Sequence, residues 1–465
     1  MEGFISVLKI VYISFMVLLL FNLTIFVHEF GHYLLARWRG LKVEAFAVWF
    51  GPALWRRKIK GVEYILGSVP LGGYVKLPQL QWDDTIEGRS NVPKEELAPV
   101  HPINKLPTLF AGSFFNVLFA FFIATILWIV GIPVPESMLN TTLGYVPDDS
   151  IEYRAGLRTG DKIVSINNDK VNDWQEIRVD VALSTSSAVN VTVQRNGKLE
   201  TFPIYPSKNS TFGVRELQVG PTTAVVLGNV GKDLPAYAAG LRPEDQVLVF
   251  DGIKVLSEQH FRKLITERGG KLCLIEVQRG RDKQTMTVTP AEDPATKQAR
   301  IGIYGFKEEP TRLMHNDPLK QVASVVVQMM QTFNALFHHK ESGVGVDDLS
   351  GPIGIVTVLW ATMASDIRLA LNMLVLLNVN LAVINLLPLP VLDGGHIVFT
   401  LLEWIRKRPL PQRVMEILQN SFVILLLAFV LYVSFNDVKR LPRLFGGAPR
   451  SSSGNAQPAP AAPAK

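Results

Sequence analysis

Cysteine is almost absent from this chain of 465 residues, and histidine is scarce. The one cysteine, Cys273, excludes an intramolecular disulfide, and its apolar neighbours predict a small core residue and not a reactive thiol. Charged residues make up 19% of the chain and hydrophobic residues 48%, a balance that predicts a membrane protein with sizeable water-exposed parts. No stretch combines basic residues with regularly placed aromatic residues, so the net charge of +6 implies no nucleic-acid partner.

Four apolar runs are long enough to cross a bilayer. They cover approximately residues 4–35, 106–132, 367–387 and 414–435. The first run lacks both a basic leading region and a small-residue cleavage site, so we do not expect it to be a cleaved signal peptide. The sequence therefore predicts a polytopic α-helical membrane protein of four transmembrane helices.

The end of the first run carries the sequence His28-Glu29-Phe30-Gly31-His32. Residues four apart lie on one face of a helix, so His28 and His32 can direct ring nitrogens at one metal ion. Glu29 lies about 100° further round the helix, where it can reach a water beside the metal without being a ligand. H-E-x-x-H is the pattern of zinc peptidases in which the glutamate is the general base. The structural alternative is weaker, because ionisable groups at membrane depth are costly and usually functional.

A second polar cluster follows the third run and ends in Pro388-Leu-Pro390-Val-Leu-Asp393-Gly-Gly. The prolines must end the helix and the glycines allow a tight path, so Asp393 is presented where the span ends. In an alternating topology the first and third spans end in the same leaflet, so Asp393 can be the third zinc ligand and leave a fourth position for water. The alternative for Asp393 is an ordinary Asp-Gly turn at a helix exit.

Lysine and arginine are concentrated in two of the connections. They cluster between the first and second runs, and the short link between the third and fourth runs contains Arg406, Lys407, Arg408 and Arg413. Both connections are expected to be cytoplasmic, which places the termini and residues 133–365 outside the cytoplasm of a bacterial cell and the metal site near the cytoplasmic side of its inner membrane. Basic residues 439, 440 and 443 argue the other way.

The middle of the chain contains an internal repeat at an offset of about 84 residues. Ala-Gly-Leu-Arg at 155–158 recurs at 239–242, and Val-Gln-Arg at 193–195 recurs at 277–279. Each copy continues into short alternating strands, which predicts two similar α+β domains.

These motifs together resemble those of the site-2 protease family of intramembrane zinc metalloproteases. The resemblance rests on H-E-F-G-H, on the G-x-x-x-N of Gly112 to Asn116, and on N-L-L-P-L-P-V-L-D-G-G from Asn385, while A-G-L-R-x-G-D resembles bacterial PDZ domains. Bacterial members have four spans with PDZ domains between the second and third. One departure is Ser113, where the family often has proline after the glycine.

The resemblance implies that His28, His32 and Asp393 bind Zn²⁺ and that Glu29 is the catalytic base. It implies a membrane-associated β-hairpin at about 49–77 that pairs with an extended substrate. For Asn116 the residues alone leave two roles open, span-to-span contact or substrate binding. The expected substrate-binding residues are Asn380, Asn385, Pro388, Pro390, Gly72, Gly73 and Asn116. The implied partners, besides the lipid bilayer, are single-pass membrane proteins already shortened outside, such as anti-sigma factors, or signal-peptide remnants.

The expected organisation follows from these elements. It consists of an N-terminal membrane region (1–136), extracytoplasmic PDZ-like domains at 137–207 and 215–305, an amphipathic helix and linker (316–365), a C-terminal membrane region (366–445) and a disordered tail (446–465).

Two other functions are compatible with parts of this pattern. A membrane scaffold would use the PDZ-like domains to bind peptides and the metal for structure only. A metal transporter would need ionisable groups in several spans, and the second and fourth runs offer almost none.

Overall fold

The computed structural model describes residues 2–80, 97, 100–209, 214–293, 297–408 and 410–445. The predicted tail at 446–465 lies outside these residues. Within the described part, four helices are long and apolar enough to cross a bilayer. They are α1 (Glu2–Trp38), α3 (Pro102–Val130), α11 (Ile367–Asn385) and α13 (Gln412–Phe445). They occupy the four places expected from the sequence.

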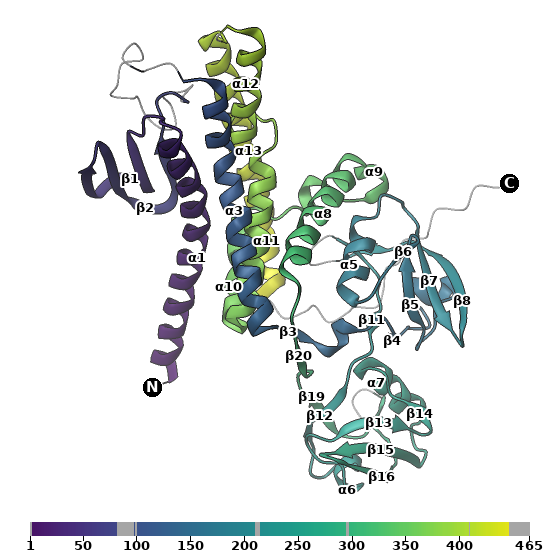
Figure 1. Cartoon of the computed structure of the whole chain (residues 1–465). Helices are drawn as coiled ribbons and strands as arrows, with labels where there is room; N and C mark the ends of the chain where they lie inside the picture. Colours follow the sequence, from purple (N-terminus) through teal and green to yellow (C-terminus); the bar gives the residue numbers. More distant parts are fainter. Residues whose placement is uncertain are drawn as a thin grey trace, which may run out of the picture.

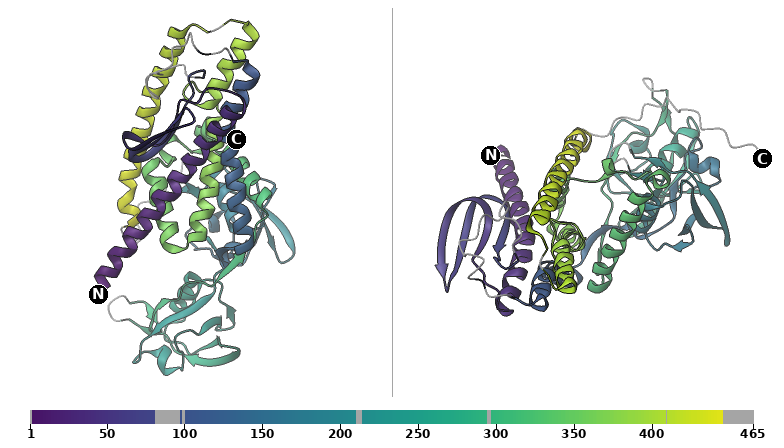
Figure 2. Two further views of the ribbon diagram at one scale, coloured as in Figure 1. Left: turned by 60° about the vertical axis from the view of Figure 1, so that its left-hand side comes forward. Right: turned by 90° about the horizontal axis from the view of Figure 1, so that it is seen from above.

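The helices alternate in direction (Figure 1). The N-terminus and the ends of α3 and α13 lie toward the repeat domains, and α12 (Asp393–Arg406) lies at the opposite end. Helix α3 contacts both α1 and α11, and their buried apolar residues form one core with α10 (Pro352–Ser365) and α8 (Pro318–Phe337). Two views at other angles show the same arrangement (Figure 2).

Helix α13 continues well past its predicted end at 435. The last turns of the helix carry polar residues that contact the start of α10 and the chain before it. The carboxylate of Asp437 accepts hydrogen bonds from the backbone N–H groups of Gly351 (3.2 Å) and Gly354 (2.8 Å), which lie at the N-terminus of α10. Tyr432 and Arg440 donate hydrogen bonds to Asp347. These contacts explain why the helix continues beyond the end of its apolar run.

The β-hairpin consists of β1 (Ala45–Ile59) and β2 (Val62–Lys76). Residues 45–48 pair with both 63–66 and 73–76, while residues 55–59 pair with 62–66. The hairpin is thus folded back on itself into four segments in the order 53–59, 62–67, 45–50 and 69–76. The two outer pairs are antiparallel, and the central pair runs parallel, since 45–48 pair in order with 63–66. The bend in β1 has positive φ at Trp49 (70°) and Gly51 (86°). The sheet begins four residues before the expected 49.

The repeat domains have matching elements and separate apolar cores. The first has the sheet order β6-β5-β7-β8 and the second β16-β15-β13-β12-β19, with β14 paired to β13. The first contains β4 (Leu143–Tyr145), α4 (Ile151–Ala155), β5 (Lys162–Ile166), β6 (Asp169–Lys170), α5 (Trp174–Leu183), β7 (Val189–Arg195), β8 (Lys198–Ile204), β9 (Ser207–Lys208), β10 (Arg215–Glu216) and β11 (Gly220–Pro221). The second contains β12 (Val225–Val230), α6 (Pro235–Ala238), β13 (Gln246–Phe250), β14 (Ile253–Lys254), α7 (Glu258–Glu267), β15 (Cys273–Arg279), β16 (Asp282–Val288), β17 (Ala291–Glu292), β18 (Ala299–Arg300) and β19 (Ile303–Phe306).

One buried ion pair explains why the same motif occurs in both copies. Asp161 accepts a hydrogen bond from the N–H of Arg158 (2.7 Å) and binds the guanidinium of Arg195 through both oxygens (2.8 and 2.7 Å). Asp245 and Arg279 repeat this geometry at 2.7 and 2.8 Å. Each arginine also donates to the carbonyl of the motif glycine, so the residues spaced along the repeat meet at one point.

The predicted boundary between the domains needs correction. Leu217 and Val219 are buried in the core of the first domain, and β11 pairs with β4 of that domain. Residues 215–221 therefore belong to the first domain, and the second begins near β12.

The repeat domains are connected to the membrane helices by a short ribbon. Strand β3 (Ile132–Pro135), which follows α3, pairs with β20 (Thr311–Met314), which precedes α8. The remaining short elements are η2 (Glu136–Leu139), α9 (His339–Ser342) and η3 (Val346–Asp348). Helix α8 packs on α11 through a hydrogen bond from Gln321 to Asn372 (2.7 Å).

Candidate metal centre and active site

Three side chains from two segments that are far apart in sequence meet at one point. Nε2 of His28 and Nε2 of His32 are 3.2 Å apart, and each lies 3.3 Å from Oδ2 of Asp393. The two histidines come from one face of α1, and Asp393 is the first residue of α12. Among the described residues this is the group of His, Cys, Asp and Glu whose atoms could hold a metal ion.

The tight turn before α12 places Asp393. Residues 386–392 form a compact turn between α11 and α12, and the first turn of α12 packs directly against the carbonyls of that turn. A Cβ on Gly394 would lie 2.3 Å from the carbonyl oxygens of Leu386 and Leu387, and one on Gly395 would lie 2.0 Å from that of Leu389. Only glycine fits at these two positions, which are the glycines of the L-D-G-G motif.

The ligand atoms fit zinc by spacing and by chemistry. Zinc takes imidazole nitrogen and carboxylate oxygen at about 2.0 to 2.1 Å in a tetrahedron, so its ligand atoms lie about 3.3 Å apart. Nδ1 of His32 lies 2.8 Å from the carbonyl oxygen of Thr108, which can only accept, so that nitrogen carries the proton and Nε2 presents a lone pair. Oδ2 of Asp393 is buried without a hydrogen-bond partner in the described chain. Lone pairs that face each other this closely repel unless a cation lies between them.

Helix α3 supports the imidazoles from behind. Nδ2 of Asn116 lies 3.2 Å from Nδ1 of His28, and Asn116 is fully buried. Gly112, one turn earlier, faces the site so closely that a Cβ there would lie 2.3 Å from Nε2 of His32. The G-x-x-x-N motif thus places a glycine against the ligands and an amide behind them.

The cluster lines a cavity of about 290 Å³. Glu29 lines the same cavity beside the two histidines, and so do Gly73, Tyr74 and Val75 of β2. A Cβ on Gly73 would lie 3.6 Å from Cγ of Glu29, so the edge of the hairpin passes directly over the glutamate. The site therefore joins a metal centre, a carboxylate and the edge of a sheet.

The other residues expected to bind substrate are only partly brought together. Asn385 lines the cavity, with Nδ2 3.4 Å from Nε2 of His28. Gly72 precedes the cavity-lining segment, and its φ of 79° turns β2 around the ring of Phe50. Asn380, Pro388, Pro390 and Asn116 are not among the residues that line the cavity. Of the two roles left open for Asn116, the structure shows the contact between spans.

The cavity also has lining residues that sequence reasoning did not select. His396 lies one turn after Asp393, and its Nδ1 is buried without a partner in the described chain. Gln419 reaches the cavity from α13 and is 5% exposed. Helical spacing from Asp393 could have indicated His396, whereas nothing in the sequence distinguishes Gln419.

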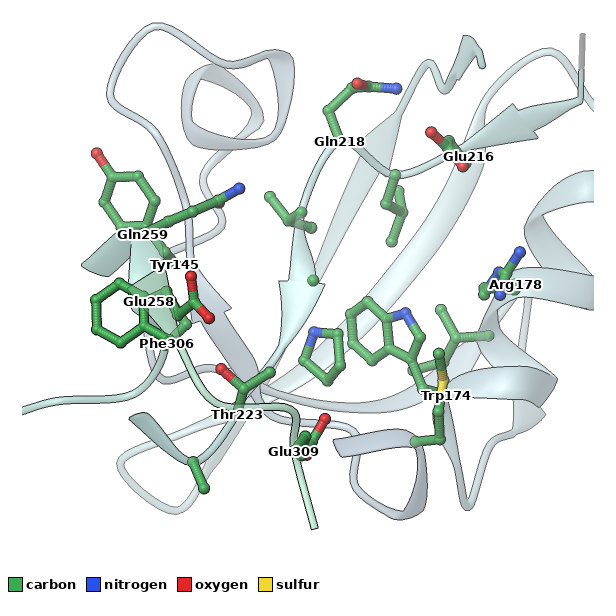
Figure 3. Close-up of a pocket in the computed structure, with 18 of the residues that line it drawn as sticks. Tyr145, Trp174, Arg178, Glu216, Gln218, Thr223, Glu258, Gln259, Phe306 and Glu309 are labelled. Carbon is green, nitrogen blue, oxygen red and sulfur yellow. The ribbon is translucent and has the colours of Figure 1, made fainter. Parts of the chain in front are cut away.

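A larger cavity, of about 780 Å³, lies between the repeat domains (Figure 3). Trp174 and Arg178 of α5 line it, together with Glu216, Glu258 and Glu309. It is separate from the His28–His32–Asp393 cluster, and the described residues that line it form no group of ligands of that kind. The smaller cavity is the one with the chemistry of a hydrolase.

Comparison with known proteins places the chain in a family. Residues 16–429 match the model of peptidase family M50. This chain belongs to peptidase family M50. The regulator of sigma-E protease RseP of Escherichia coli K12 is 31% identical over 466 residues, covering 92% of this chain and 98% of that protein. A Neisseria meningitidis serogroup A protein named as a zinc metalloprotease is 31% identical over 442 residues, covering 89% of this chain and 96% of its own length.

Solved structures match a smaller part of this M50 peptidase. The PDZ domain of the SdrC-like protein Lin2157 of Listeria innocua covers 20% of this chain and 99% of its own, at 23% identity and a TM-score of 0.17. The corresponding domain of Listeria monocytogenes Lmo2051 covers 19% of this chain and 90% of its own, at 25% identity and a TM-score of 0.16. The family and its relatives identify the protein as a zinc metalloprotease, and its four long apolar helices are those of a membrane protein.

Proposed function

We propose that this M50 peptidase hydrolyses peptide bonds within the membrane-spanning segments of single-pass proteins, with His28, His32 and Asp393 holding Zn²⁺ and Glu29 as the general base. The observation that carries the proposal is the triangle of two imidazole nitrogens and one carboxylate oxygen with edges of 3.2 to 3.3 Å, on the wall of a cavity that Glu29 shares. When bound, zinc would act as a Lewis acid toward a water molecule and the substrate carbonyl.

The residues of the chain perform the proton transfers and hold the ligands in place. The carboxylate of Glu29 takes a proton from the attacking water and later gives it to the leaving amine nitrogen, so the proton balance closes. The carbonyl of Thr108 fixes the tautomer of His32, and Asn116 braces His28. Both keep Nε2 directed toward Asp393.

A helical substrate must be unwound first, because its amide groups are bonded within the helix. Residues 69–76 of β2 form an outer segment of the hairpin sheet, paired along one side with 45–50, and Gly73 to Val75 line the site cavity. An extended substrate can add to this segment as a further strand, which brings its main chain beside Glu29. Asn385, at the end of α11, supplies an additional side-chain amide to the same cavity.

The substrates and the orientation follow from the family and the charge pattern. The relatives that bear the name regulator of sigma-E protease support anti-sigma factors shortened on their outer side, or signal-peptide remnants, as substrates in regulated proteolysis. The basic link at 406–413 supports a cytoplasmic location for α12, with the termini and both repeat domains outside. The cavity would then lie near the cytoplasmic side of a bacterial inner membrane.

The test compares Glu29→Gln with wild type in the purified, zinc-loaded full chain, using candidate single-pass membrane proteins and signal peptides. We expect Glu29→Gln to bind zinc normally and to cleave nothing, whereas His28→Ala and Asp393→Ala lose zinc as well. Glu63→Gln, on the hairpin, is the matched control and should cleave normally. Turnover by Glu29→Gln at the wild-type rate contradicts the proposal, and so does a wild-type protein that binds zinc and peptides without cleaving any of them, which is the behaviour of a scaffold.

A further inference from the structure

Helix α13 has few buried residues, and one of them is an unpaired amide. Most of its large apolar side chains are exposed toward the surroundings, as expected of a membrane helix with few neighbours. Among its buried residues, Val433 and Asp437 face α10, whereas Met415 and Gln419 lie one turn apart near the other end. Asp437 is satisfied by the backbone of α10, but Oε1 of Gln419 has no hydrogen-bond partner within the described chain.

Burial of an amide oxygen without a partner is unfavourable, and most of all where no water can reach it. An apolar side chain would fill the same space in this span without that loss. Such an atom in a native structure therefore needs an explanation, and a functional role is one.

The position of Gln419 indicates what the partner is. Gln419 lines the cavity that contains His28, Glu29, His32 and Asp393. The cavity borders β2 through Gly73 to Val75, and α13 contributes Gln419 to the lining of the same cavity. A strand added to β2 uses the N–H and C=O groups along one of its edges, and those along its other edge point away from the sheet. In a membrane those groups need partners from the protein.

We propose that Gln419 is a substrate-positioning residue whose Oε1 accepts a hydrogen bond from a backbone N–H of the unwound substrate, on the edge that β2 does not pair. This inference rests on the proposed proteolytic function. The substrate atom is a donor because the unpaired atom is an acceptor. It belongs to the main chain because an unwound segment presents such N–H groups whatever its sequence, so the contribution is similar for all substrates.

The test uses the zinc-loaded full chain and a synthetic transmembrane peptide that the wild type cleaves. A series of peptides carries single backbone amide-to-ester replacements near the cleaved bond, each of which removes one N–H. Gln419→Leu should lower kcat/KM by about fivefold to tenfold on the all-amide peptide, as expected for one hydrogen bond. At one position the ester should slow the wild type by a similar factor and slow Gln419→Leu no further. Asn420→Leu removes the neighbouring, exposed amide and should have no effect.

The controls separate this contact from packing and from the proposed function. Zinc content and thermal midpoint should match the wild type in Gln419→Leu, and Gln419→Asn, whose amide is one methylene shorter, covers the case in which the leucine variant fails to fold. Unchanged kinetics in both variants, or ester effects that add to the Gln419 effect at every position, would overturn the inference. Cleavage by Glu29→Gln would instead contradict the proposed function. The two failures can be told apart, because the Glu29→Gln measurement leaves Gln419 unchanged.

Discussion

Nδ2 of Asn116 lies 3.2 Å from Nδ1 of His28, on the side of the ring away from Asp393. The amide oxygen of Asn116 is buried and has no partner within the described chain. If the amide turns by 180°, which leaves its shape unchanged, the oxygen accepts from Nδ1–H and Nε2 keeps its lone pair for a metal. The amide then has a good partner and the ring has the tautomer that a ligand needs.

Replacing Asn116 with leucine should therefore weaken zinc binding without removing a ligand. The loss of such an outer contact typically costs about tenfold to a hundredfold in metal affinity. Competition with a chelator, read as zinc retained per chain, measures it. Asn378→Leu is the matched control, because this buried amide also joins two helices, through Thr24 (3.2 Å), without touching an imidazole. Equal zinc affinity in the two variants would remove the orienting role of Asn116.

Gly112 provides a steric test of the same support. Alanine at this position would place its Cβ 2.3 Å from Nε2 of His32 and 2.8 Å from Nε2 of His28, so the imidazoles must move. We expect Gly112→Ala to lose most of its zinc and activity. Gly220→Ala is the control, since a Cβ there meets no atom within 4 Å and the backbone is not in the left-handed region. Full zinc occupancy in Gly112→Ala would show that the helices adjust without cost.

The cluster of candidate metal ligands was predictable because its residues obey helical spacing. His28 and His32 share a face at four residues. The prolines before α12 and the two glycines that follow Asp393 predict the turn that positions Asp393. The same rule separates the asparagines of α11. Asn378 and Asn385 are seven residues apart and share a face, whereas Asn380 lies about 200° from Asn378, so one face takes two of the amides and leaves the third elsewhere. Asn378 contacts Thr24 and Asn385 lines the cavity.

Other features depend on contacts that no local pattern encodes. The hairpin doubles back because Trp49 and Gly51 adopt positive φ, which converts two long strands into four segments. Leu217 and Val219 look like the start of a second domain in sequence, yet they pack into the first. Gln419 is one polar residue in an apolar run, and only the position of α13 shows that it faces the site.

The orientation of the protein in the membrane can be tested with engineered cysteines, because the native cysteine should not react with the labelling reagent. Cys273 is 1% exposed and burial raises the pKa of its thiol, so it should resist maleimides in the folded protein. In cells with a permeabilised outer membrane, an impermeant maleimide should label Lys170→Cys, on the first repeat domain, while the inner membrane is intact. Arg408→Cys, between α12 and α13, should be labelled only after the inner membrane is opened. The reverse pattern would invert the proposed topology.

The first repeat domain should become less stable as the pH rises through about 6. Burial, reinforced by the charges of Asp169 and Glu176, raises the pKa of Asp180 on α5 to about 6. A carboxyl with a raised pKa in the folded state is harder to ionise there than in the unfolded chain. The resulting destabilisation is absent below about pH 4, where both states are protonated, and complete above the folded pKa.

Asp180→Asn should therefore slow hydrogen exchange of the α5 amides at pH 8 and leave it unchanged at pH 4, after correction for intrinsic rates. Asp169→Asn should give a smaller effect in the same direction, since it removes one of the two neighbouring charges. A stabilisation by Asp180→Asn that is equal at both pH values would mean that the effect is not electrostatic.

Asp437 should be one of the largest single contributors to the stability of the C-terminal helices. It is 4% exposed in α13 and accepts from the N–H groups of Gly351 and Gly354, which begin α10. A carboxylate at a helix N-terminus also interacts favourably with the helix dipole. Asp437→Ala leaves both donors without this partner and should cost about 1 to 3 kcal/mol.

The thermal midpoint of the purified full chain measures this loss, with zinc content as a second readout. Asp317→Ala is the matched control, because Asp317 caps α8 through the N–H of Lys320 (2.9 Å) but is exposed, so water replaces it and the midpoint should fall less. Asp437→Asn keeps an acceptor oxygen and should lie between wild type and alanine. If Asp437→Ala had the same thermal midpoint as the wild type, the contact between α13 and α10 would not contribute to stability. The extension of α13 beyond its apolar run would then need another cause.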